Sequence, residues 1–123
     1  MISPLSDRPW LASYTPDVPA DVEVPDEPVC ASLTRSATRF GDRIAVDFLG
    51  RTLTYRELAD EVDRAAGALK SLGVAAGDRV AIALPNCTTH VVAFYAVLRL
   101  GAVVVEHNPL YTCLLYTSDA ADE

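Results

Sequence analysis

Residues 79–108 read RVAIALPNCTTHVVAFYAVLRLGAVVVEHN, and this stretch decides the fold. The apolar runs at 79–84 and 102–105 lack the polar alternation of a strand with one solvated face, which is typical of strands buried on both faces. Residues 88–101 lie between them with helical spacing and end in glycine. The stretch therefore predicts a parallel strand–helix–strand unit with a right-handed connection.

A helix and a hairpin are expected upstream of this unit. Residues 30–40 place apolar side chains at helical spacing, and Gly41 is expected to end that helix. Two short strands then flank Leu49-Gly50, where the glycine allows a tight turn. Apolar residues alternate with polar or small ones along the first strand: Ile44, Val46 and Phe48.

A second helix follows the hairpin. Thr54 and Glu57 have the spacing of a capping box, in which each side chain accepts from the other residue's backbone amide. Gly73 is expected to end the helix. Six apolar side chains fall on one face of it and predict its buried side: Leu58, Val62, Ala65, Ala66, Leu69 and Leu72.

The first 28 residues form a different kind of segment. They hold six of the eight prolines, which excludes a long helix or a central strand. We expect an extended arm at 1–28, pinned to a surface by Trp10, Leu11 and Tyr14. The fold class is therefore α/β, in the order arm, helix, β-hairpin, helix and parallel βαβ unit. Two central strands are few for a parallel sheet, so the sheet is expected to be incomplete.

Composition restricts the classes of function. The formal charge is −7 and the ten basic residues are scattered, which argues against nucleic acid as a partner. No run of 18 apolar residues and no leader pattern occur, so we expect a cytoplasmic protein. Cys30, Cys87 and Cys113 lack the spacing of metal ligands and are interpreted as reduced thiols.

The polar residues after the two central strands are the candidate site. Ligands of open parallel sheets bind outside the carboxyl ends of the strands, where Glu106, His107 and Asn108 would line a crevice. The alternative interpretation is a polar turn that leaves a strand. Asn86 and Cys87 hold the same position after the first strand, at a helix start that could attract an anion, although no glycine allows a phosphate to approach.

Other residues that could carry chemistry have plainer interpretations. Asn86 or Thr88 is expected to cap the helix, and His90 in its first turns is interpreted as solvated or half-buried. Neither Cys30 nor Cys87 has a basic neighbour that would mark a nucleophile. Four carboxylates are interpreted as a solvated helix face and not as an acid–base pair: Glu57, Asp60, Glu61 and Asp63.

Three motifs, in order and spacing, resemble the AMP-forming acyl-CoA synthetases of the adenylate-forming superfamily. They are LTYREL at 53–58, GVAAGDRVAIALPN at 73–86 and LRLGAVVVEHNPLYT at 98–112. The form NPLYT, together with WLASYTPDVP at 10–19, is most similar to the long-chain fatty acid–CoA ligases. The resemblance implies that 29–112 is the start of an AMP-binding domain, the incomplete N-terminal portion of the large domain.

The resemblance also implies a two-step ligase reaction in a longer protein. A carboxylate reacts with ATP and Mg²⁺ to give acyl-adenylate and pyrophosphate, and coenzyme A then displaces AMP. The implied partners are small molecules, namely fatty acid, ATP and coenzyme A, and such ligases also associate peripherally with membranes. The family's phosphate loop, adenine pocket and catalytic lysine match no position here. We therefore assign no catalytic, cofactor-binding or metal-binding residue, and expect this fragment to bind no cofactor and to be inactive.

The last eleven residues, CLLYTSDAADE at 113–123, do not fit the family pattern. They resemble the translation of an adapter used in transposase-based sequencing libraries, so we expect this tail to be non-native and the protein to be an incomplete reading of a longer gene. A genuine, divergent terminus is the alternative.

Two other functions stay open. The longer protein could be another adenylate-forming ligase, such as an aryl-CoA ligase or a peptide-synthetase adenylation domain. A stand-alone, non-enzymatic α/β binding module is a third hypothesis, disfavoured because the exposed edges of a half-built sheet promote association.

Overall fold

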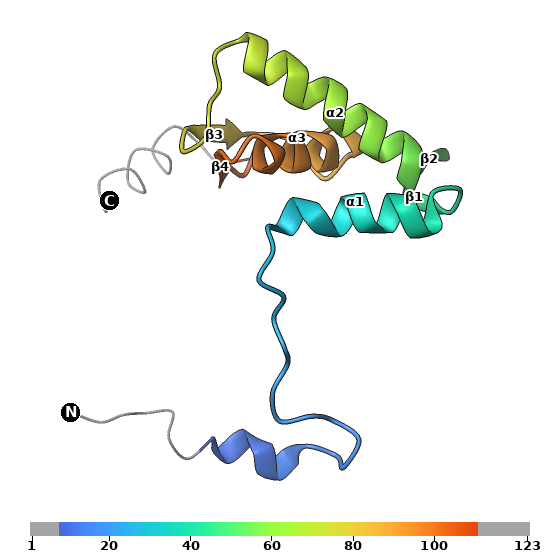
Figure 1. The fold of residues 1–123 in the computed structure, drawn as a ribbon, viewed down its shortest axis with the longest axis vertical. Coiled ribbons are helices and arrows are strands. Elements are labelled where there is room, and N and C mark those ends of the chain that lie inside the picture. Colours follow the sequence, from blue (N-terminus) through green and yellow to red (C-terminus); the bar gives the residue numbers. More distant parts are fainter. Residues whose placement is uncertain (1–7, 111–123) are drawn as a thin grey trace, which may run out of the picture.

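The computed structural model describes residues 8–110. An N-terminal segment hangs below a layer of three helices, and a hairpin and a pair of parallel strands lie at opposite ends of that layer (Figure 1). A short 3₁₀ helix, η1 Pro9–Ser13, lies within the segment expected to be an extended arm. The other elements run in the order expected from the sequence: α1 Val29–Phe40, β1 Ile44–Phe48, β2 Arg51–Thr54, α2 Tyr55–Ser71, β3 Arg79–Ile82, α3 Thr88–Arg99 and β4 Val103–Glu106.

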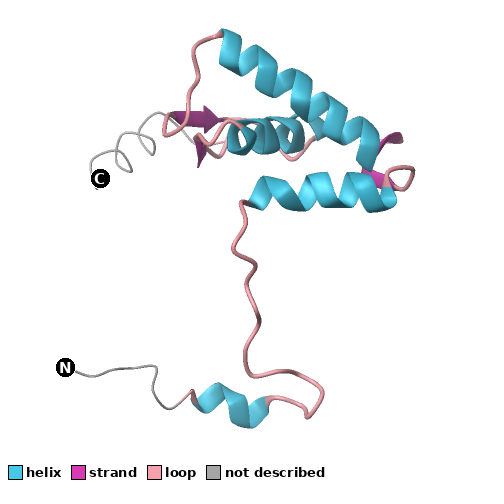
Figure 2. Cartoon of the chain, viewed as in Figure 1, coloured by secondary structure: helices cyan, strands magenta, loops and turns pink. Residues whose placement is uncertain are grey.

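The core lies where α1, α2 and α3 meet (Figure 2). Val62 and Ala96 are fully buried there, at 0% exposure each. Half-buried side chains from the hairpin and the helices surround five buried residues: Leu33, Leu58, Val62, Ala66 and Ala96. The face predicted for α2 is confirmed except at its end, because Leu72 is the C-cap of the helix and 82% exposed.

The start of α2 is the predicted capping box. The Thr54 hydroxyl accepts from the Glu57 amide at 3.2 Å, and the Glu57 carboxylate accepts from the Thr54 amide at 2.8 Å. Both bonds satisfy backbone groups that have no partner within the helix. The carboxylate of Glu57 also accepts from the Thr54 hydroxyl at 2.9 Å. Donation from the Thr54 amide, and then from this hydroxyl, holds the pKa of Glu57 below its ordinary value of 4.5.

The hairpin forms as predicted, but the expected strict alternation of buried apolar residues along β1 is wrong. β1 and β2 are antiparallel around Leu49-Gly50, and the register shifts between Ile44 and Val46. A bulge turns successive side chains away from strict alternation, so Ile44 is 61% exposed while Val46 is half-buried.

β3 and β4 pair in parallel, with Ile82 opposite Glu106, which confirms the strand pairing of the predicted βαβ unit. Within the described residues the two strands are covered on one face, as expected of an incomplete sheet. α3 is the described helix that contacts both strands. Ile82 is therefore buried at 4% exposure, while Ala81 and Val103 are exposed.

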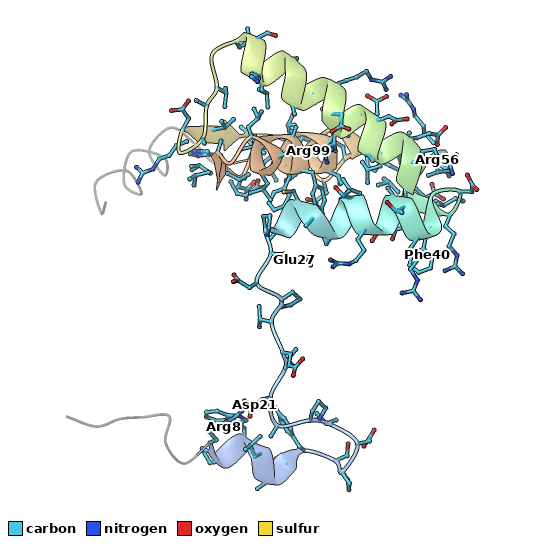
Figure 3. The ribbon with its side chains drawn as sticks, viewed as in Figure 1. Arg8, Asp21, Glu27, Phe40, Arg56 and Arg99 are labelled. Atoms are coloured by element: carbon cyan, nitrogen blue, oxygen red, sulfur yellow. The ribbon has the colours of Figure 1, made fainter. Side chains whose placement is uncertain are left out.

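The expectation that Trp10, Leu11 and Tyr14 pin the arm to a surface is also wrong within the described chain. η1 contacts no other described helix or strand, and Trp10 and Tyr14 are 40% and 44% exposed. The arm instead closes on itself, because Arg8 pairs with Asp21 at 2.9 Å (Figure 3). An extended segment then leads to α1.

Arg99 joins all three helices near the core. It lies in the last turn of α3, and its Nε is 2.6 Å from a carboxylate oxygen of Asp63 on α2. The guanidinium also donates to the Thr34 hydroxyl of α1 at 3.3 Å (Figure 3). Within residues 8–110, no helix has both the length and the apolar character needed to cross a membrane.

Shortening Val62 is the sharpest test of the core. Val62→Ala removes two methyl groups from a fully buried site, and we expect the free energy of unfolding to fall by about 2 kcal/mol. Leu72→Ala, at an exposed position, is the matched control and should change it by less than about 0.5 kcal/mol. Urea unfolding of the chain followed by circular dichroism measures both, and equal effects would contradict this placement of the core.

The capping box predicts a pH dependence. Because the pKa of Glu57 is lowered in the folded chain, its charge stabilises the fold above the unfolded pKa, and this stabilisation is lost as pH falls through the folded pKa. Wild type should therefore melt above Glu57→Gln at neutral pH, and the two should converge in acid. Thermal melts across this pH range measure the gap, and a gap that stays constant would argue against a charged cap.

Candidate functional site

The carboxyl ends of β3 and β4 lie side by side, as the candidate crevice requires. The His107 amide donates to the Ile82 carbonyl at 2.9 Å, which extends the parallel ladder one residue past Glu106. Glu106 and His107 therefore leave the sheet beside the segment that leads from β3 into α3. His107 is half-buried and Glu106 is exposed.

His90 contacts this edge from the first turn of α3. Its Nε2 lies 3.1 Å from a carboxylate oxygen of Glu106, and its side chain is 23% exposed. His90 is half-buried, one of the two outcomes expected of it, but residue types along the chain did not indicate this partner. A helix that follows one parallel strand returns to the next, so its first turn lies over the end of the following strand. That geometry is the signal that could have paired His90 with Glu106.

The second ring nitrogen of His90 has no such contact. Nδ1 is buried and has no hydrogen-bond partner among the described residues. A proton on Nε2 would let the ring donate to the carboxylate of Glu106.

Asn108 makes a local turn. Its side-chain oxygen accepts from the Leu110 amide at 3.0 Å, a bond two residues along the chain that is typical of an Asx turn. This bond supports the plainer interpretation of Asn108 as part of a polar turn that leaves the strand. Glu106, His107 and Asn108 are thus neighbours, but the carboxylate of Glu106 faces His90.

The start of α3 does not form the predicted cap. Cys87 is the N-cap residue, and no side chain caps the helix. The expectation that Asn86 or Thr88 would do so is wrong, because Cys87 takes the extended N-cap conformation and a thiol is a weak acceptor.

A pocket of about 370 Å³ lies beside this turn, lined by Val46, Asp47, Phe48, Asn86, Cys87, His90 and Val91. Its largely apolar walls suit an apolar group better than an anion.

Three acids of α2 have structural partners. Besides the capping Glu57, Asp63 pairs with Arg99 on α3 at 2.6 Å, and Glu61 pairs with Arg64 at 2.6 Å. The interpretation of these acids as a solvated helix face stays a prediction. The inter-helix pair of Asp63 was not visible in the sequence, because it depends on how α3 crosses α2.

The described residues do not fit ATP with Mg²⁺. No group of three His, Cys, Asp or Glu side chains in residues 8–110 is arranged to hold a metal ion. A phosphate-binding helix start needs backbone amides that a ligand can approach closely, usually through glycines, whereas α3 begins Cys87-Thr88-Thr89 beside an apolar pocket. We therefore derive no catalytic step from this part of the chain.

Known proteins are similar to this chain in sequence and in fold. The family described as AMP-binding enzyme matches residues 33–113. The chain is 42% identical over 107 residues to a long-chain-fatty-acid–CoA ligase of Bacillus subtilis, covering 87% of the chain and 19% of that protein. It is 40% identical over 107 residues to the ligase of the same name from Salmonella typhimurium, covering 84% of the chain and 19% of that protein. The chain thus spans about a fifth of the length of these relatives.

Solved structures agree. The N-terminal subdomain of Klebsiella oxytoca NpsA, in complex with anthranilyl-AMSN, superimposes with a TM-score of 0.74 at 28% identity, over 77% of this chain and 25% of that one. The anthranilate CoA ligase AuaEII, in complex with anthranoyl-AMP, gives a TM-score of 0.71 at 26% identity, over 78% and 19%. The expected α/β fold, as an N-terminal portion of an adenylate-forming enzyme, is confirmed. By its sequence and its fold, the chain belongs to the AMP-binding enzyme family.

Proposed function

We propose that this chain is the N-terminal part of an ATP-dependent fatty acid–CoA ligase. The observation that carries the proposal is the 42% identity over 107 residues to a curated long-chain-fatty-acid–CoA ligase. The NPLYT sequence at 108–112, at the end of the third motif, supports the same branch of the family. In the proposed reaction a fatty acid and ATP give acyl-AMP and pyrophosphate, and coenzyme A then gives acyl-CoA and AMP.

In this proposal the described residues are scaffold for a longer protein. ATP, Mg²⁺ and coenzyme A bind residues beyond Thr112, because nothing in residues 8–110 fits a triphosphate or a metal ion. The proposed organisation is an arm at 1–28, the start of the AMP-binding domain at 29–112 and a non-native tail at 113–123. The tail lies outside the described residues. We place the longer protein in the cytoplasm, with peripheral association at membranes where its fatty acid substrate resides.

An aryl-CoA ligase or a peptide-synthetase adenylation domain is the second candidate. The solved neighbours bound to anthranilyl and anthranoyl groups favour it, at 28% and 26% identity respectively. Their identities are well below the 42% and 40% shared with the fatty acid ligases. A scaffold common to both branches would account for the structural match, and the longer sequence matches support the fatty acid ligase as the first candidate.

The gene itself is the first test. Sequencing the source DNA through the codon of Thr112 should show a reading frame that departs from CLLYTSDAADE and continues into a Ser/Thr/Gly-rich, lysine-containing phosphate loop. DNA that encodes CLLYTSDAADE followed by a stop would refute the proposal of a non-native tail.

The protein expressed from that longer frame should make acyl-CoA from long-chain fatty acids in preference to anthranilate, benzoate or acetate. Pyrophosphate release measures the first step, and omission of coenzyme A should block thioester formation only. The 123-residue chain alone should release no pyrophosphate above the blank, since the family's phosphate loop matches no position of its sequence. Faster turnover of anthranilate or benzoate would favour the second candidate.

A further inference from the structure

We draw no further inference here: the strongest candidate, the apolar pocket of about 370 Å³ between β1 and the start of α3, belongs to the site already described, and nothing in the structure shows what covers it in a chain that spans about a fifth of the length of its curated relatives.

Discussion

The close approach of α2 to α1 and α3 is the constraint on which the rest of the structure depends. Val62 and Ala96 are fully buried at the centre of this contact, and the small side chain of Ala66 lets the helices come together. The hairpin packs beside this core through Val46 and Leu53, half-buried against it. Arg99 then joins the three helices at the rim through Asp63 and Thr34.

The layer of helices covers one side of the β3–β4 pair and leaves the other exposed. Val103 is 48% exposed, although its neighbours in the sequence are all apolar. A continuous apolar run is typical of a strand covered on both faces, and here the described residues supply one cover. The chain spans about a fifth of the length of its curated relatives, which is consistent with a sheet pattern that fits a larger domain.

The candidate site shows what a motif search can miss. The sequence pattern predicted that Glu106, His107 and Asn108 lie together at the end of a strand, and in the structure they follow the end of the β3–β4 pairing. It also assigns the carboxylate of Glu106 to His90, sixteen residues earlier, and leaves Nδ1 of that ring without a described partner. Neither fact follows from residue types, because both depend on the rotation of α3 about its own axis.

Local structure could be predicted from the sequence: the capping box at Thr54 and Glu57, the helix ends at glycines and the parallel βαβ pattern. These features depend on backbone chemistry within a few residues. Which faces are covered could not be predicted in this way, since burial depends on segments far apart in the chain. The exposure of Leu72 and Ile44, the lack of contacts between η1 and the other described elements, and the contact of His90 with Glu106 all depend on where one element lies against another.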